Sequence, residues 1–197
     1  LHAEKKIQNK ARKDFLSFVK CMWPEFVQGS HHKHIADKFN KLATGEITRL
    51  IVNMPPRHTK SEFASYLLPS WMVGRDPKLK IIQTTHNSEL AVRFGRKSKH
   101  LIDSEEYKKI FSTTLQEDSK AAGRWETAQG GEYFAAGVGG AITGRGADLL
   151  IIDDPHSEQD ALSPTALESA YEWYTSGPRQ RLQPGGKIVL VMTRWST

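Results

Sequence analysis

The chain has 197 residues, and its hydrophobic share of 38% suits a single α/β domain with a buried core. A formal net charge of +6 suits a polyanionic partner without requiring one. The single cysteine, Cys21, excludes an intramolecular disulfide framework. Neither an apolar run of about 18 residues nor a signal segment is present, so we expect no export and no membrane partner. The start at Leu1 and the stop at Thr197, directly after an apolar strand, favour a fragment of a longer protein.

The N-terminal quarter of the chain carries two helical patterns. Apolar residues at helical spacing predict one amphipathic helix that ends at Trp23-Pro24. They are Ile7, Ala11, Phe15, Phe18, Val19 and Met22. A second pattern predicts a helix from Ser30 to Gly45. His31, His32 and His34 lack the spacing that would place three imidazoles on one helix face, so we expect surface or loop histidines rather than a metal site.

The stretch from Leu50 to Glu62 predicts a short strand, a tight loop with two prolines, and a helix that opens at Lys60-Ser61. A loop between a buried strand and a helix N-terminus directs backbone N–H groups at one point, which suits a phosphate. A lysine there neutralises terminal phosphates, and the following serine can hold Mg²⁺. The stretch therefore indicates nucleoside triphosphate hydrolysis. In one further interpretation, His32 borders the base of the nucleotide together with Trp23 or Phe26.

The letters of this loop depart from the usual G-x-x-x-x-G-K-[ST], which would need glycines at Met54 and Thr59. On this stretch alone, an ordinary strand–turn–helix junction with a solvated Lys60 is an equal alternative. The run from Leu149 to Asp154 favours the phosphate site, because it predicts a buried parallel strand that ends in two carboxylates. Adjacent buried acids are costly unless a cation holds them, and Mg²⁺ would do so.

The segment from Leu79 to Thr84 predicts another strand, and Asn87 can cap the helix that follows it. The outer side of this helix carries four cations, which are Arg93, Arg96, Lys97 and Lys99. Two interpretations stay open for this side. It is either a solvated charged face, which is the more common case, or a contact with nucleic-acid phosphates.

The remaining elements complete an α/β pattern. Residues Arg124 to Ala135 predict a hairpin, and a glycine-dense loop with Arg145 follows it. Ser163-Pro164 predicts the start of a helix, and Lys187 to Met192 predict the last strand. The expected buried stripe of this helix consists of Leu167, Ala170, Tyr171 and Tyr174. Four apolar strands separated by helical patterns predict a mostly parallel central sheet with helices on both faces.

Three segments carry a family resemblance: Pro55 to Ser61, Ile142 to Pro155, and Val191 to Trp195. In this order they resemble the ATPase domain of the large terminase subunit of tailed bacteriophages, over nearly the whole chain. The resemblance implies a P-loop NTPase of the additional-strand type, a motor that uses ATP and Mg²⁺ to pump double-stranded DNA into a preformed capsid. It implies a helical segment at residues 1–48, an ATPase core at residues 49–197, and a C-terminal nuclease that this sequence lacks.

The resemblance also implies roles for single residues. Lys60 would contact the β- and γ-phosphates, and Ser61 and Asp153 would hold Mg²⁺. Asp154 stands where many such motors have a catalytic glutamate, so it would be the general base. Its side chain is one methylene shorter than glutamate, which makes Glu158 the alternative base.

Further roles follow from the same resemblance. Thr193 would couple hydrolysis to DNA movement, Arg57 would stabilise charge in the loop, and Arg145 would act as an arginine finger on a neighbouring subunit. The nucleotide-binding residues would be Pro56, Arg57, His58, Thr59, Lys60, Ser61 and Glu62. The DNA contacts would be Arg96, Lys97 and Lys99.

The expected partners are double-stranded DNA, the portal protein, the small terminase subunit and further copies of the chain in a ring. The expected location is the procapsid in the host cytoplasm. Two other classes stay open. A helicase-like or restriction-type DNA-dependent ATPase would show a second helicase-type core domain. A non-catalytic nucleotide-binding or DNA-docking module, which the missing loop glycines favour, would release no phosphate from ATP.

Overall fold

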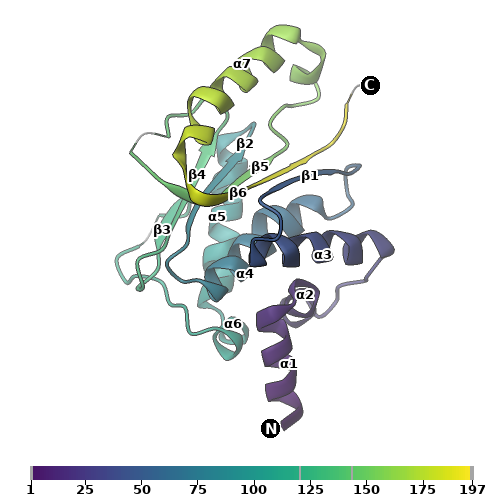
Figure 1. The fold of residues 1–197 in the computed structure, drawn as a ribbon, viewed down its shortest axis with the longest axis vertical. Helices are drawn as coiled ribbons and strands as arrows, with labels where there is room; N and C mark the ends of the chain where they lie inside the picture. The colour runs from purple at the N-terminus through teal and green to yellow at the C-terminus, as the bar shows by residue number, and fades with distance from the viewer. Residues whose placement is uncertain (1, 120, 143, 196–197) are drawn as a thin grey trace.

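A computed structural model of the chain describes residues 2–119, 121–142 and 144–195, and it is built around one six-stranded sheet (Figure 1). The strands are β1 (Arg49–Asn53), β2 (Lys80–Thr85), β3 (Arg124–Glu126), β4 (Glu132–Gly137), β5 (Ala147–Asp153) and β6 (Leu182–Met192). Their order is β1-β6-β5-β2-β4-β3. All neighbours are parallel except β3 and β4, which form the antiparallel hairpin. This confirms the predicted α/β class, the mostly parallel sheet and the hairpin.

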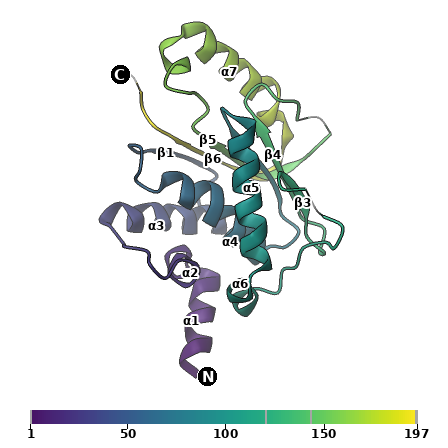
Figure 2. The same cartoon turned by 180° about the vertical axis from the view of Figure 1, so that it is seen from behind.

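The helices lie on both faces of the sheet, as predicted. They are α1 (His2–Lys13), α2 (Phe15–Met22), α3 (Ser30–Thr44), α4 (Leu68–Arg75), α5 (Ser88–Asp103), α6 (Glu105–Ile110) and α7 (Pro164–Ser176). Shorter turns are η1 (Glu62–Leu67), η2 (Asp160–Leu162) and η3 (Pro178–Arg181), of which η1 is π-helical. Figures 1 and 2 show α7 at one end of the molecule and α1 and α2 at the other, with the sheet between them.

Alternate residues of β5 face two separate cores. Leu149 and Ile151 join the large core that α1 to α6 share with one face of the sheet. Leu150 and Ile152 join a smaller core on the other face, against which α7 packs Trp173. Burial on both faces is what the unbroken apolar run of this strand predicts.

The N-terminal helices are part of the large core rather than an appendage. The Phe15 ring on α2 lies 5.0 Å from Phe39 of α3 and 5.4 Å from both Phe63 and Trp71, in edge-to-face contacts. Phe63 and Trp71 belong to η1 and α4, which follow the predicted phosphate loop. Packing of the first 48 residues therefore helps to fix the position of that loop.

The prediction of one N-terminal helix is wrong, because the helix breaks at Asp14. This residue has an extended backbone (φ −125, ψ 120), and its side chain caps α2 by accepting from the Ser17 N–H at 2.8 Å. Asn40 of α3 locks the break, since it donates to Asp14 at 2.9 Å and accepts from the Phe15 N–H at 2.8 Å.

The predicted buried stripe of α7 is also wrong. No residue of this helix is buried, and Leu167 and Tyr171 are 39% and 61% exposed. The helix contacts the sheet only with partly buried side chains such as Trp173 and Tyr174, so the apolar spacing does not mark a core face here. Within the described residues, no helix is long and apolar enough to cross a membrane.

Candidate functional site

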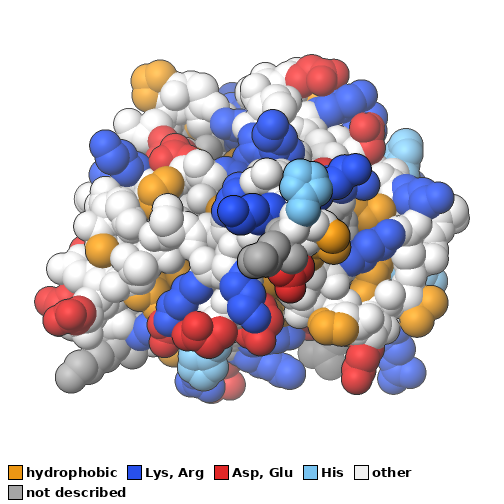
Figure 3. Space-filling model, turned by 90° about the horizontal axis from the view of Figure 1, so that it is seen from below, with side chains coloured by type: hydrophobic (Ala, Val, Ile, Leu, Met, Phe, Trp, Pro, Cys, Tyr) orange, Lys and Arg blue, Asp and Glu red, His pale blue; other side chains and the backbone are white. Residues whose placement is uncertain are grey.

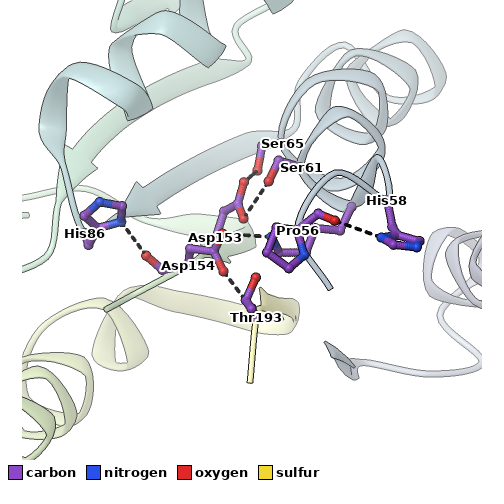
Figure 4. A network of polar contacts seen from close by, with 9 residues as sticks. Pro56, His58, Ser61, Ser65, His86, Asp153, Asp154 and Thr193 are labelled. Carbon is purple, nitrogen blue, oxygen red and sulfur yellow. Dashed lines mark hydrogen bonds and ion pairs between the residues drawn. The ribbon is translucent and has the colours of Figure 1, made fainter. Parts of the chain in front are cut away.

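The predicted loop and the predicted acids meet at one edge of the sheet. β1, β6 and β5 are parallel neighbours, so the segments that follow them emerge at the same edge. Asn53 ends β1 opposite Met192 of β6, and Asp153 ends β5 opposite Val191. Figure 4 shows the resulting cluster, in which side chains from the loop, from η1 and from the end of β6 surround the two acids.

Asp154 is held from several directions. The Lys60 ammonium lies 2.9 Å from its Oδ2, and the Thr193 N–H donates to its Oδ1 at 2.8 Å. Its carbonyl accepts from the backbone N–H and the ring Nδ1 of His86, at 3.1 and 2.9 Å. The backbone of Asp154 is left-handed (φ 42), a conformation that non-glycine residues adopt only where the surroundings impose it. The contacts on both ends of the residue supply that constraint.

Asp153 is buried and faces two hydroxyls. Ser61 donates to its Oδ1 at 3.1 Å and Ser65 to its Oδ2 at 2.7 Å, and the Gln83 amide donates to the Ser65 hydroxyl at 3.0 Å. Burial raises the pKa of the Asp153 carboxyl to about 6, although the two serine hydroxyls and Lys60 lower it. A cation bound at this carboxylate would relieve the cost of burying its charge.

Two residues of the loop adopt a backbone conformation that glycine favours, although neither is glycine. Arg57 and Thr59 both have left-handed conformations, with φ 61 and φ 63. Thr59 occupies the position where the usual pattern has glycine, and it adopts the backbone conformation that glycine favours. Helical structure begins directly afterwards at Lys60 and continues into η1.

The structure brings together five of the predicted site residues: Lys60, Ser61, Asp153, Asp154 and Thr193. Pro56, Arg57 and His58 are exposed on the neighbouring loop, where the His58 ring Nδ1 lies 2.8 Å from the Pro56 carbonyl oxygen. Glu158 is exposed after β5 and, among the described residues, shares no hydrogen bond or ion pair with the cluster.

The three predicted DNA contacts lie on α5, away from Asp153 and Asp154. Lys97 forms an ion pair with Glu62 at 2.6 Å and lies over the Tyr66 ring, 4.4 Å from its centroid. Lys99 donates to the Ser119 carbonyl. These two cations therefore brace the start of η1 and the segment after α6 within their own chain.

Arg145 also lies away from the cluster. Its guanidinium is 3.4 Å from Glu132 and lies over the Phe134 ring, 4.3 Å from the centroid. Glu132 pairs with Lys80 at the start of β2, whereas Asp153 pairs with Thr85 at its end. Glu132, and Arg145 with it, therefore lies at the amino end of the parallel strands, whereas Asp153 lies at their carboxyl end.

Sequence reasoning missed Ser65, Gln83 and His86. The spacing of Ser65 is the one signal that was available, because residues four apart lie on one side of a helix and Ser61 was already a candidate. Gln83 is one of three consecutive buried polar residues of β2, with Thr84 and Thr85, and nothing in the local pattern of the strand points to its partner. His86 acts on the Asp154 backbone, which no sequence pattern reveals.

The cluster suits a magnesium ion that is coordinated both by protein side chains and by a phosphate group of a ligand. No group of three or more His, Cys, Asp or Glu side chains in the described part of the chain is placed to hold a metal. Ser61 and Asp153 offer two adjacent oxygens, and Mg²⁺ is commonly held by one or two such ligands together with substrate phosphates. A cavity of about 120 Å³ beside Asp154 and Thr193 has room for water.

These features define an α/β protein with a lysine, a hydroxyl and two carboxylates at the carboxyl ends of parallel strands. No protein-family model and no curated protein matches the sequence. Among solved structures, the chain is similar to the HK97 bacteriophage large terminase, with a TM-score of 0.59 and 12% identity. The match covers 92% of this chain and 37% of that one. The likeness shows a terminase-like fold.

Proposed function

We propose that the chain is the ATP-hydrolysing motor domain of a DNA-packaging protein, a P-loop NTPase that uses Mg²⁺. The convergence of Lys60, Ser61, Asp153, Asp154 and Thr193 carries this proposal, because it places a phosphate-binding cation, two candidate Mg²⁺ ligands and a candidate base at one point. The terminase-like fold agrees with it.

Each of these residues has one task. Lys60 would neutralise the terminal phosphates, and Ser61 and Asp153 would hold Mg²⁺, which would supply further positive charge to the phosphates. Asp154 orients a water molecule and accepts its proton. Lys60 forms an ion pair with Asp154 at 2.9 Å, so binding of Lys60 to a phosphate would free the carboxylate for this role. Thr193 donates to Asp154 from the end of β6, which links the base to the strand that leaves the site.

Two arginines are proposed to stabilise charge in the transition state. Arg57 is exposed on the loop beside Lys60, so it would act within its own subunit. Arg145 is held by Glu132 at the opposite edge of the sheet, so it would act on a neighbouring subunit in a ring. Mixing Arg145→Ala with Lys60→Ala chains tests this, because the second chain can lend its arginine to the first. Restored turnover supports action on a neighbour, and a mixture as inactive as its parts refutes it.

The decisive measurement of the function is nucleotide binding and phosphate release by the purified chain. Lys60→Ala is expected to weaken binding of MgATP, because it removes charge from the phosphate site. Asp154→Asn is expected to bind MgATP and to release no phosphate, because the amide cannot accept a proton from water while Lys60, Ser61 and Asp153 remain. Glu158→Gln is the matched control and should keep turnover. A wild-type chain that binds ATP without releasing phosphate would make it a nucleotide-binding module.

Double-stranded DNA is the proposed track, with the portal protein and the small terminase subunit as further partners. The proposed contacts on α5 are Arg96, Lys97 and Lys99. A second basic surface exists on α1, whose Lys and Arg residues are Lys5, Lys6, Lys10, Arg12 and Lys13. Figure 3 views the molecule from this end and shows many Lys and Arg side chains among acidic ones.

A salt titration distinguishes the two surfaces. A translocase grips phosphates, so DNA binding is expected to weaken steeply with salt and to be indifferent to sequence. Replacing the three α5 cations with Ala is expected to reduce the salt slope, and replacing Lys5, Lys6 and Lys10 serves as the matched comparison. An unchanged slope in the α5 variant means that this helix face is only solvated or internally paired.

A further inference from the structure

The loop residue Thr59 needs an explanation beyond the proposed reaction. Its φ of 63 lies in the left-handed region, which a β-branched side chain rarely enters. Such conformations persist where surrounding contacts hold them. The contact that holds Thr59 comes from α3, since the Nε2 of His32 lies 2.7 Å from the Thr59 hydroxyl.

The hydrogen bonds around His32 form a chain with one direction. The Gly29 N–H can only donate, so the His32 Nδ1 accepts at 2.8 Å. The Thr59 hydroxyl donates to the His58 carbonyl at 2.5 Å, so it accepts from the His32 Nε2–H. The imidazole is therefore neutral, with its proton on Nε2. A protonated ring would place an Nδ1–H against the Gly29 N–H and break the chain.

Packing keeps the His32 ring in place. The side chain is 5% exposed and lies 4.7 Å from the Phe26 ring and 5.1 Å from the Phe63 ring. The titratable groups that face it are His31 on its own helix and His58 on the loop. Burial, and then these two histidines, lower the pKa of His32, which agrees with a neutral ring.

We propose that His32 is a positioning residue, which holds Thr59 in its left-handed conformation and so keeps the loop in the shape that receives phosphate. The inference rests on the proposed nucleotide site and assigns a role to the hydroxyl that stands in the usual glycine position. Glycine needs no such support, because it adopts a positive φ without strain.

The first test is a double-mutant cycle on the dissociation constant for MgATP, measured by titration calorimetry. His32→Phe keeps an aromatic ring and removes both hydrogen bonds, so we expect roughly tenfold weaker binding. In a Thr59→Gly background, the same substitution is expected to change binding less than about twofold. His34→Phe, at an exposed position of α3, is the control and should leave the affinity unchanged. An equal loss in both backgrounds would overturn the proposal, because His32 would then act without Thr59.

The second test needs no nucleotide. Histidine side-chain NMR of the ¹⁵N-labelled chain is expected to show His32 as the neutral Nε2–H tautomer, and still neutral when the pH falls below about 6.5, the ordinary pKa of an imidazole. An Nδ1–H tautomer, or protonation of His32 at the ordinary imidazole pKa, would refute the hydrogen-bond chain. If the wild-type chain binds no MgATP, the proposed function fails, and this spectrum still decides whether His32 holds Thr59.

Discussion

We expect the ion pair between Lys60 and Asp154 to contribute measurably to the free energy of unfolding. The two charges lie 2.9 Å apart, with the lysine side chain 7% exposed and the aspartate 24% exposed. Lys60→Met keeps most of the aliphatic chain and leaves Asp154 and the buried Asp153 without their cation. Removing one partner of a fully buried pair costs about 3–5 kcal/mol. Because Asp154 is partly solvated and keeps the Thr193 N–H, we expect a loss of about 2 kcal/mol.

A double-mutant cycle separates the pair from the other effects of each substitution. Asp154→Asn alone is expected to cost about 2 kcal/mol, because it leaves a buried ammonium unpaired. The double variant should lose about 1 kcal/mol less than the sum of the single losses, since the second substitution removes a charge that the first left uncompensated.

Urea unfolding followed by tryptophan fluorescence measures these free energies, since Trp71 and Trp125 are fully buried. The matched control is Lys41→Met, whose ion pairs with Asp37 and Glu46 lie on the surface and should contribute less than about 0.5 kcal/mol. Strictly additive losses in the cycle would show that Lys60 and Asp154 do not interact in solution, and the resting arrangement of the site would have to be revised.

Two further predictions concern buried polar groups. Ser65→Ala is expected to lower the free energy of unfolding by about 1–3 kcal/mol, because it removes a buried donor to Asp153; no change in urea would show that the bond contributes nothing. The pKa of His32 is lowered in the fold by burial and then by His31 and His58, so the folded state binds fewer protons than the unfolded state. Its contribution to stability is present above the unfolded pKa of about 6.5 and is lost as the pH falls below it. His32→Phe should flatten this pH dependence, and an unchanged curve would refute the assignment.

Much of the fold was predictable because the sequence patterns are local. The continuous apolar run of β5 predicts a strand that is buried on both faces. The helical spacing of the apolar residues of α5 predicts a helix that is buried on one face. The break at Asp14 was not predictable, since it depends on Asn40 from another helix. The exposure of Leu167 was not predictable either, because an apolar stripe does not say whether anything covers it.

The candidate site was predictable for those residues that lie in the segments directly after the parallel strands. Lys60, Ser61, Asp153 and Asp154 were found because parallel strands place their carboxyl ends at one edge. The resemblance assigned Arg145 to the site of a neighbouring subunit, and its side chain lies with Glu132, away from the cluster of its own chain. Side-chain direction in a glycine-rich loop depends on backbone angles that the sequence leaves free.

Two of the departures from the usual nucleotide-site pattern share a structural feature. Thr59 stands where the usual loop pattern has glycine, and Asp154 stands where the family resemblance implies glutamate; both have left-handed backbones, each costing about 1–3 kcal/mol. A histidine from another element contacts each of them: His32 bonds the Thr59 hydroxyl, and His86 bonds the Asp154 carbonyl. The left-handed turn at Asp154 also changes where its shorter side chain projects, which is one way to place a carboxylate without the extra methylene. Replacing Thr59 with glycine would therefore remove the need for His32, so substitutions at these two positions are expected to act as a pair rather than singly.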